Sequence, residues 1–481
     1  MLMEDGFLDR EWEMGWLQRG WESGKAEFRI LFGRRRVGKS ALLDEFARDK
    51  RCVLFQAVEG SPADHLRDMT GAILACEDDR VLREGPLSSW QAALAKLLEM
   101  AERERLLVII DEYQYVAEAD RTLASLLQRW WSREAAQSSI YLVLCGSYIR
   151  FFMDNVLNGP AYGRNTGFVQ LQPLTYRQAA GFLDSWTAED KLRAFAVTGG
   201  IPHYLAQLDP ERSLEWNVEH KVLERGAVLF QEAELLMREE LREPRVYYSI
   251  LRAISEGCTR VNDIQQRALP GRRSNEIQPY LSTLQELNLV ELSQPVTGDA
   301  FRRGVWTITD PYLRFWFRFV LPNRVYLEHG VDPRQVYRSS IGPRLDHFVS
   351  KPLFEEVCRQ WLLDRMVAGE VPAADKVGSW WGPIPAQAGD KRRSQMEGEV
   401  DVVAVKGGRI AVAGEAKWTA EPVGFGILNH LREVAHHLPG AGEDTQLMLF
   451  GRTFDPRLAE AAQAEGIRLV GVAELYGGVP R

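Results

Sequence analysis

The segment Gly33–Ser40 (GRRRVGKS) has the residue types and spacing that bind nucleotide phosphates. An apolar segment, 27–32 (EFRILF), precedes it, and the residues that follow (ALLDEFARD) have the apolar spacing of an amphipathic helix. A strand, a glycine-rich loop and a helix in this order form a phosphate-binding loop, because the loop amides and the helix N-terminus face the phosphates. Lys39 can reach the β- and γ-phosphates, and the Ser40 hydroxyl can ligate Mg²⁺. We therefore expect ATP and Mg²⁺ as ligands, held by Gly33, Arg34, Arg35, Arg36, Val37, Gly38, Lys39, Ser40 and Ala41.

Two acidic residues, Asp111 and Glu112, follow the apolar segment 106–110 (LLVII). Such a continuous apolar run is typical of a strand that is buried on both faces. An Asp at the carboxyl end of this strand can hold the water shell of Mg²⁺, and the next Glu can polarise the attacking water, which indicates a hydrolase. A third apolar run, 140–145, is followed by Gly146 and Ser147, and Ser147 either senses the γ-phosphate or only caps the strand. We expect ATP hydrolysis, with Glu112 and the loop lysine as catalytic residues.

One sheet must position these residues. Five apolar segments predict five parallel strands with helices between them, at 27–32, 52–57, 106–110, 140–145 and 168–174. The motifs FLDREWE, GRRRVGKS, IIDEYQYV, LCGSY, AYGRNTG and GGIPHYL, in this order, resemble the archaeal-type family of AAA-related ATPases, which also occurs in bacteria. The resemblance covers about 5–235 and implies a five-stranded core with a small helical lid.

The resemblance also implies roles outside the phosphate-binding loop. Phe7–Arg10 would approach the adenine, and Gly199–Pro202 would lie in the lid. Arg164 of AYGR would reach the γ-phosphate, either in its own subunit or in a neighbouring one; the alternative is a surface salt bridge. Gln114 would link the nucleotide state to a bound partner, although the start of a solvated helix is the interpretation that we favour.

Three charged residues near the C-terminus, Asp401, Glu415 and Lys417, converge if EVDVVAV and RIAVAGEAKW form a hairpin. With a three-residue turn at 406–408, Asp401 and Glu415 share one face, and Lys417 lies on it because side chains alternate along a strand. Two carboxylates suit Mg²⁺, and a nearby lysine can orient the attacking water or help to deprotonate it. The pattern predicts a second hydrolytic site, with Asp401 and Glu415 as metal ligands.

The aromatic segment 310–324 (DPYLRFWFRFVLPNR) resembles the opening of the domain of unknown function 234, which follows this ATPase core in many relatives. That domain is related to the PD-(D/E)XK restriction-endonuclease-like nucleases. The resemblance implies that Glu355 is the family's upstream helix glutamate and adds an acidic contact; Glu356 is the alternative. Aromatic side chains next to arginines can stack on nucleic-acid bases, but their helical spacing here favours packing in a hydrophobic core.

Residues 244–308 predict three helices and a two-stranded hairpin, which is the order of a winged helix-turn-helix. Arg272–Arg273 precede the third helix and Arg302–Arg303 lie on the wing, where such a domain contacts DNA. Docking of a protein is the alternative role. Pro279, inside the third helix, counts against a straight recognition helix.

The composition is typical of a soluble cytoplasmic protein. The chain has 481 residues, a net charge of −8 and five widely spaced cysteines, which exclude a disulfide framework and a zinc ribbon. A signal-peptide pattern and an apolar run of membrane-spanning length are both missing, so we expect no membrane partner. The expected fold class is α/β, in four domains: a P-loop ATPase core (1–176), a helical lid (177–240), a winged helix-turn-helix (241–324) and a PD-(D/E)XK-like domain (325–481).

Together, these patterns predict an ATP-hydrolysing protein that couples its nucleotide state to a Mg²⁺-dependent nuclease acting on DNA. One alternative is a regulatory switch that binds DNA or protein without cutting. The other is a defence or stress ATPase whose nuclease acts only on a trigger. An arginine acting in trans would make the protein a homo-oligomer.

Overall fold

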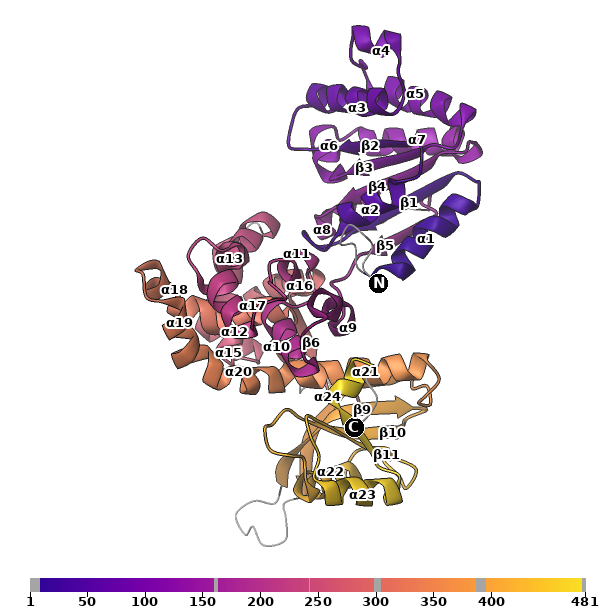
Figure 1. Ribbon diagram of the computed structural model, residues 1–481. Coiled ribbons are helices and arrows are strands. Elements are labelled where there is room, and N and C mark those ends of the chain that lie inside the picture. Colours follow the sequence, from indigo (N-terminus) through magenta and orange to yellow (C-terminus); the bar gives the residue numbers. More distant parts are fainter. Residues whose placement is uncertain (1–8, 160–162, 242, 298–303, 386–394, 478–481) are drawn as a thin grey trace. The chain divides into compact units, whose positions relative to one another are not determined.

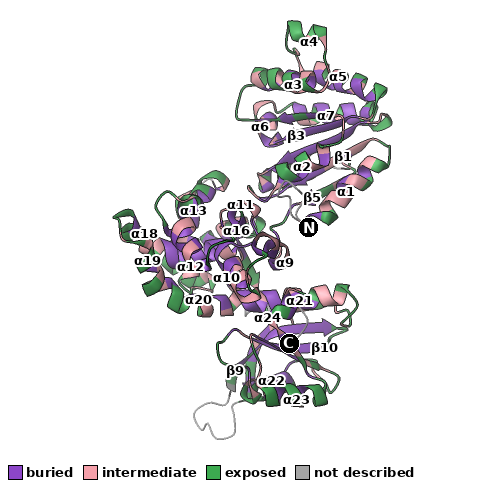
Figure 2. Ribbon diagram, viewed as in Figure 1, coloured by how far each residue is buried: buried purple, intermediate pink, exposed green. Residues whose placement is uncertain are grey.

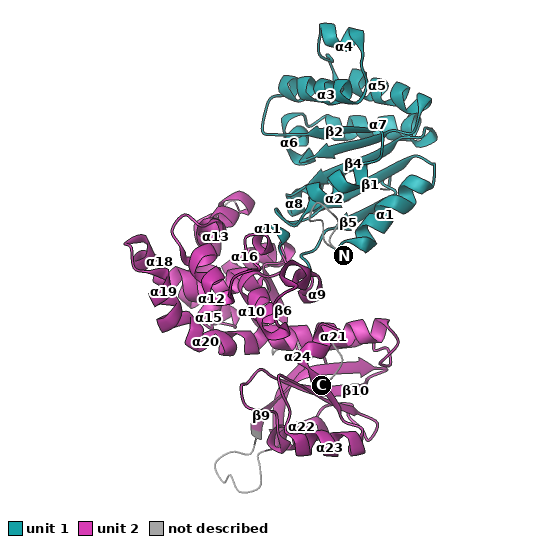
Figure 3. Cartoon of the chain, viewed as in Figure 1, with its two compact units in different colours: residues 1–174, 201–203 teal, residues 175–200, 204–481 magenta. Residues whose placement is uncertain are grey.

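The computed structural model describes residues 9–159, 163–241, 243–297, 304–385 and 395–477 (Figure 1). The chain divides into two compact units (Figure 3), residues 1–174 with 201–203 and residues 175–200 with 204–481. The segment expected as a lid belongs to the second unit, apart from Ile201–His203. Phe7, Leu8, Arg302 and Arg303, named above, lie outside the described residues.

The first unit is built on a parallel five-stranded sheet, as the sequence predicts, and its strand order is β2-β3-β4-β1-β5. The strands are β1 (Glu27–Phe32), β2 (Cys52–Gln56), β3 (Leu107–Asp111), β4 (Tyr141–Gly146) and β5 (Gly167–Gln170). All residues of β3 and β4 are buried, as their continuous apolar sequences require (Figure 2). Because the strands are parallel, the residues that follow β1, β3 and β4 meet at one edge of the sheet.

Helix α1 (Glu11–Glu22) precedes the sheet, and the other helices connect its strands. They are α2 (Lys39–Ala47), α3 (Pro62–Cys76), α4 (Arg80–Glu84), α5 (Trp90–Arg103), α6 (Tyr113–Ala119), α7 (Leu123–Arg133) and α8 (Ile149–Phe151), with the 3-10 helix η1 (Ala135–Gln137) and the π-helix η2 (Phe152–Leu157). Helix α5 illustrates why they form. Ser89 caps its first turn by accepting a hydrogen bond from the Ala92 amide, and the residues that it buries, such as Leu94 and Leu97, recur at helical spacing.

The next segment of the chain forms a series of helices, and the first of them contribute apolar residues to the core of the C-terminal domain. They are α9 (Tyr176–Ala179), η3 (Ala180–Leu183), α10 (Ala188–Thr198), α11 (Pro202–Leu205), α12 (Leu214–Asn217), η4 (Val218–Leu223) and α13 (Val228–Glu240). Tyr176, Leu192 and Ala196 are buried in one hydrophobic cluster with Trp361 and Trp418. The segment 175–200 is therefore part of that core.

Three helices and a hairpin follow, in the predicted order. They are α14 (Pro244–Ser255), α15 (Val261–Ala268), η5 (Ser274–Ile277) with α16 (Gln278–Glu286), and the antiparallel strands β6 (Val290–Ser293) and β7 (Val305–Ile308). The expectation that Pro279 lies in the interior of the third helix is wrong. Pro279 lies in the first turn of α16, where the missing amide costs no hydrogen bond.

The aromatic segment forms core, as its spacing predicts. It spans α17 (Pro311–Phe315), η6 (Trp316–Val320) and the start of α18 (Leu321–Glu328), and Tyr312, Phe315 and Trp316 are fully buried. The chain continues through α19 (Pro333–Val336), η7 (Tyr337–Ile341), α20 (Gly342–Phe348), η8 (Val349–Phe354) and α21 (Glu355–Val367).

A second five-stranded sheet, in the order β12-β11-β10-β9-β8, forms the C-terminal domain. Its strands are β8 (Lys376–Pro385), β9 (Gln395–Lys406), β10 (Arg409–Lys417), β11 (Gln446–Gly451) and β12 (Arg468–Gly471), and its helices are α22 (Phe425–His436), α23 (Pro456–Glu465) and α24 (Val472–Leu475). Strands β8, β9 and β10 pair antiparallel, whereas β10, β11 and β12 pair parallel. The first unit, the second sheet and the helices make a mixed α/β fold.

The turn between β9 and β10 differs from the prediction of a three-residue loop. It contains only Gly407 and Gly408, which have φ values of 57° and 77° and thus suit a tight two-residue turn. That turn alone would put Asp401 and Glu415 on opposite faces. An extra residue, Ala411, is inserted as a β-bulge between Ile410 and Val412 and shifts the register by one. The bulge restores the predicted shared face.

Candidate active sites

The loop Gly33–Ser40 joins the end of β1 to the start of α2, as the sequence predicts. A side chain on Gly33 would come within 2.5 Å of the Leu171 carbonyl oxygen, and Gly38 has a φ of 96°, so both positions require glycine. Lys39 is buried, and its Nζ donates to the carbonyl oxygens of Gly33 (2.9 Å) and Arg34 (3.2 Å). The ammonium is therefore held inside the loop that would surround a phosphate chain.

The two expected Mg²⁺ ligands of this unit lie together. Ser40 Oγ donates to Asp111 Oδ2 at 2.8 Å, across the gap between the loop and the end of β3. Asp111 is almost fully buried, and its other oxygen accepts the Glu112 amide at 2.9 Å. A hydroxyl and a carboxylate in this arrangement suit a hard cation next to nucleotide phosphates.

Glu112 is held by the residues that follow it and by the end of β4. Its backbone has a φ of 52°, in the left-handed region that a glutamate rarely adopts. Its Oε2 accepts hydrogen bonds from Ser147 Oγ (2.8 Å), from the Ser147 amide (3.2 Å) and from Gln114. The favoured interpretation of Gln114 as a solvated helix start is wrong, because its side chain is buried and also donates to Ser147 Oγ at 3.4 Å. Ser147 thus contacts the expected general base directly.

Two further segments border the phosphate-binding loop. Arg10 is buried and donates to the Val37 carbonyl oxygen at 3.0 Å. Pro202, of the motif GGIPHYL, lies within 3.7 Å of the position that a side chain on Gly38 would occupy. Next to it, burial and the charge of Arg36 lower the pKa of His203, which favours a neutral imidazole at this loop.

The structure does not bring Arg164 together with the phosphate-binding loop. Arg164 is exposed and precedes the start of β5, where its Nε donates to Ser132 Oγ, near the end of α7, at 3.4 Å. Because β5 runs parallel to β1, the start of β5 lies at the sheet edge opposite the loop. From this position, Arg164 does not reach a γ-phosphate bound at the loop of its own subunit.

The second constellation converges on β9 and β10. The pairing Val402 with Gly414, continued by one residue, places Asp401 opposite Glu415. Lys417 Nζ lies 2.6 Å from Glu415 Oε1 and 3.9 Å from Asp401 Oδ2. Asp401 and Glu415 are only 3% and 5% exposed, and Glu415 Oε2 has no hydrogen-bond partner among the described residues. A buried carboxylate oxygen without a partner is costly, which indicates a site built to bind something.

Glu355, and not Glu356, faces this site. One carboxylate oxygen each from Glu355, Glu399 and Asp401 lie within 4.8 Å of one another, which is close enough for a shared metal ion. Glu356 instead pairs with Arg314, at 2.9 Å. Glu415, predicted as a ligand, is paired with its lysine and lies outside this group of three.

Sequence reasoning missed Glu399 and Lys351. Lys351 Nζ lies 2.6 Å from Glu399 Oε1 and 3.7 Å from Glu355 Oε1. Glu399 had a signal in the sequence, since a residue two positions before Asp401 on a strand shares its face. Lys351 had none, because it precedes α21 and reaches the sheet only through the tertiary fold.

Burial and crowding of negative charge change the pKa values of these groups. Burial, together with the charge of Asp401, raises the pKa of Glu355 to about 8 and that of Glu415 to about 7. Burial also raises the pKa of Asp401. The carboxylates raise the pKa of Lys417 against the opposing effect of its burial. A divalent cation would relieve the repulsion among these carboxylates.

Two protein families match separate parts of the chain. Residues 7–208 match a family described as an ATPase domain predominantly from Archaea, and residues 316–427 match a family of archaeal and bacterial proteins of unknown function, DUF234. The chain thus carries a match to an archaeal-type ATPase domain, followed by a match to DUF234. Each matched segment contains one of the two constellations described above.

Several known proteins match this chain over most of their own length. An uncharacterised protein of Methanocaldococcus jannaschii is 26% identical over 380 residues, which are 78% of this chain and 82% of that protein. A Walker-type ATPase of Pyrococcus abyssi is 21% identical, with a TM-score of 0.48 over 66% of this chain and 97% of that one. The ORC2 protein of Aeropyrum pernix is 16% identical, with a TM-score of 0.42 over 69% and 98% of the two chains. Among the described residues, no helix combines the length and the apolar character that crossing a membrane demands.

Proposed function

We propose that this protein hydrolyses ATP at the loop Gly33–Ser40 and uses its nucleotide state to control a Mg²⁺-dependent DNA nuclease site in the DUF234 domain. The observation that carries the proposal is the convergence of Lys417 with the buried carboxylates of Asp401 and Glu415, with Lys417 Nζ 2.6 Å from Glu415 and 3.9 Å from Asp401. Two carboxylates and a lysine on one sheet face are the groups that metal-assisted hydrolysis of a phosphodiester requires.

In the ATPase site, each residue has a role that follows from its contacts. Lys39 neutralises the β- and γ-phosphates with the ammonium that it keeps inside the loop, and Ser40 and Asp111 hold the cation. Glu112 orients the attacking water and accepts its proton. Ser147 holds the Glu112 carboxylate at 2.8 Å and so fixes its direction.

In the nuclease site, Glu355 and Asp401 hold the cation, with Glu399 at the exposed side. These residues fit Mg²⁺ because all three offer oxygen atoms within 4.8 Å of one another. When bound, the ion would withdraw charge from the scissile phosphodiester. Glu415, whose pKa is raised to about 7, can accept the proton of the attacking water near neutral pH, and Lys417 orients that water.

Coupling between the two sites would run through segment 175–200. Asp346, on α20, accepts hydrogen bonds from Arg193 of α10 (2.8 Å), from Arg452 (3.2 Å) and from Trp418 Nε1 (3.1 Å). Trp418 directly follows Lys417, so this network ends one residue from the nuclease site. The next residues after α10, Ile201–His203, belong to the ATPase unit and border its phosphate-binding loop.

Helices α14 to α16 with strands β6 and β7 would contact DNA as a winged helix-turn-helix. The Trp306 amide donates to the Thr259 carbonyl oxygen at 2.9 Å and so ties the hairpin to the connection between α14 and α15. Arg272 and Arg273 are exposed before the third helix. That position in such domains faces the nucleic acid.

The test is cleavage of supercoiled and linear DNA with Mg²⁺, with and without ATP, by the wild type, Lys39→Ala and Asp401→Ala. We expect the wild type to cut, Asp401→Ala to leave both DNA forms intact, and Lys39→Ala to lose the ATP dependence. Hydrolysis of ATP without any cleavage, also in the presence of candidate activators, would refute the nuclease and favour a regulatory switch that binds DNA or protein.

A further inference from the structure

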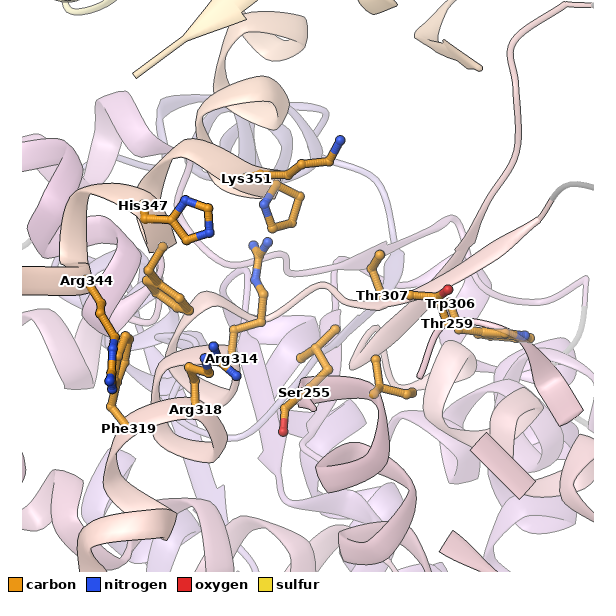
Figure 4. Close-up of a pocket in the computed structure, with 14 residues that line it drawn as sticks. Ser255, Thr259, Trp306, Thr307, Arg314, Arg318, Phe319, Arg344, His347 and Lys351 are labelled. Carbon is orange, nitrogen blue, oxygen red and sulfur yellow. The ribbon is translucent and has the colours of Figure 1, made fainter. Parts of the chain in front are cut away.

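A cavity of about 280 Å³ in the second unit is lined by cationic side chains and adjoins the acidic cluster. Five of its lining residues are basic, and none of the 14 is acidic (Figure 4). The basic residues are Arg314, Arg318, Arg344, His347 and Lys351. In a chain with a net charge of −8, this concentration of positive charge favours an anionic ligand.

Helical spacing explains how the cations gather. Arg314 and Arg318 are four residues apart, and Arg344 and His347 are three apart, so each pair lies on one face of its helical segment. Figure 4 shows Arg314 pointing toward the side of the cavity that His347 and Lys351 form. The aromatic residues between the two arginines turn inward to the core instead.

Only part of this positive charge is neutralised by the protein: Arg314 is paired with Glu356 and Lys351 with Glu399. Arg318 has no hydrogen-bond or ion-pair partner among the described residues, and Arg344 makes only a 3.5 Å contact with the Ser340 carbonyl oxygen. Thr307 also lines the cavity, and its Oγ1 is buried without a hydrogen-bond partner in the described part of the chain. These groups can all donate hydrogen bonds to phosphate oxygens.

Lys351 links the cavity to the proposed nuclease site. Its side chain lines the cavity, while its Nζ lies 2.6 Å from Glu399 and 3.7 Å from Glu355. One lysine side chain therefore separates the cavity from the acidic cluster.

We propose that this cavity holds one nucleotide of a single nucleic-acid strand, next to the phosphodiester that the acidic cluster would cleave. The inference rests on the proposed nuclease function and adds the form of its substrate. A volume of about 280 Å³ admits a single nucleotide but not a duplex. Arg318 and Arg344 bind the phosphate, since Arg314 is already paired with Glu356. The apolar wall of Trp306, Phe319 and Phe348 receives the sugar and base.

The test measures the affinity of the protein for a labelled single-stranded DNA of about 20 nucleotides by fluorescence anisotropy. Ca²⁺ replaces Mg²⁺ in this assay so that the DNA is not cleaved. Arg318→Ala and Arg344→Ala remove exposed side chains, so both variants should fold. Each is expected to weaken binding roughly tenfold and to lower the salt dependence, in a plot of log K against log salt, by about 0.7. The matched control is Arg457→Ala, an exposed arginine on α23 that is not part of the cavity, and it should bind as the wild type does.

Unchanged affinity in both cavity variants would overturn the proposal, even if the wild type cleaves DNA and Asp401→Ala does not. Conversely, weakened binding in the variants supports the cavity even if Asp401→Ala reveals no cleavage. Absence of binding to the single strand by the wild type, or equal weakening by Arg457→Ala, would also overturn it.

Discussion

The buried carboxyl group of Glu355 gives a direct test of the electrostatics of the acidic cluster. Glu355 is 8% exposed, next to Asp401, and its nearest cations are Lys351 at 3.7 Å and Arg359 at 4.0 Å. Burial and the charge of Asp401 raise its pKa from 4.5 to about 8. The substitution Glu355→Gln keeps the shape of the side chain and removes its ionisation. We expect the variant to be more stable than the wild type at alkaline pH without divalent ions.

The size of the effect follows from proton linkage. Between the unfolded pKa of 4.5 and the folded pKa of about 8, the folded chain holds a proton that the unfolded chain has lost, so the stability of the wild type falls as the pH rises. Each pKa unit corresponds to about 1.36 kcal/mol, which gives an upper value of about 5 kcal/mol. The pKa of about 8 already includes the opposing attraction to Lys351 and Arg359. We expect an advantage of about 2–4 kcal/mol at about pH 8.5, and of less than about 1 kcal/mol at about pH 5.

The assay is thermal unfolding with a chelator at both pH values. An advantage of this size should raise the unfolding midpoint of the second unit by roughly 5–10 °C at the higher pH. Glu356→Gln is the control, because Glu356 pairs with Arg314 at 2.9 Å and its replacement should give no gain. Added Mg²⁺ should stabilise the wild type more than Glu355→Gln. If the stability advantage of Glu355→Gln over the wild type is no larger at the higher pH than at the lower one, the raised pKa of Glu355 is refuted.

Other predictions concern the ATPase site and its coupling. Lys39→Ala should abolish the thermal stabilisation of the first unit by ATP, and a preserved shift would contradict the role of the loop lysine. Glu112→Gln should still bind ATP but hydrolyse it about 100- to 10,000-fold more slowly, measured by phosphate release; near-normal turnover would show that another group activates the water. Asp346→Asn weakens the contacts to Arg193 and Arg452 and should remove the ATP dependence of DNA cleavage while hydrolysis continues. Cleavage that still responds to ATP would argue against this route.

The ATPase site was predictable because its determinants are local. Gly33–Ser40 and the strand that ends at Asp111 are contiguous segments whose apolar spacing and glycine positions directly specify a strand, a loop and a helix. The sheet then brings Ser40 and Asp111 together, since parallel strands end at one edge. The burial of Gln114 could not be predicted in this way, because it depends on the contact of Gln114 with Ser147, directly after β4.

The C-terminal site was predicted with the correct face and an incorrect turn. The two-residue turn and the bulge at Ala411 each shift the pairing by one, and their effects on the shared face cancel. A bulge leaves no clear trace in an alternating apolar sequence, so only the structure reveals it. The surroundings of Arg164 and Lys351 could not be predicted from the sequence either, because they depend on contacts between segments that are distant in the chain.

The hydrophobic cluster that includes Tyr176, Leu192 and Trp418 has a consequence for the evolution of this architecture. Residues of the ATPase-family segment fill the interior of the DUF234 domain, so a recombination event that separated the two would expose apolar surface on both sides of the break. Residues 175–200 are therefore expected to be inherited together with the C-terminal domain, although the ATPase family match extends over them. Replacement of the DUF234 domain alone is not compatible with this packing.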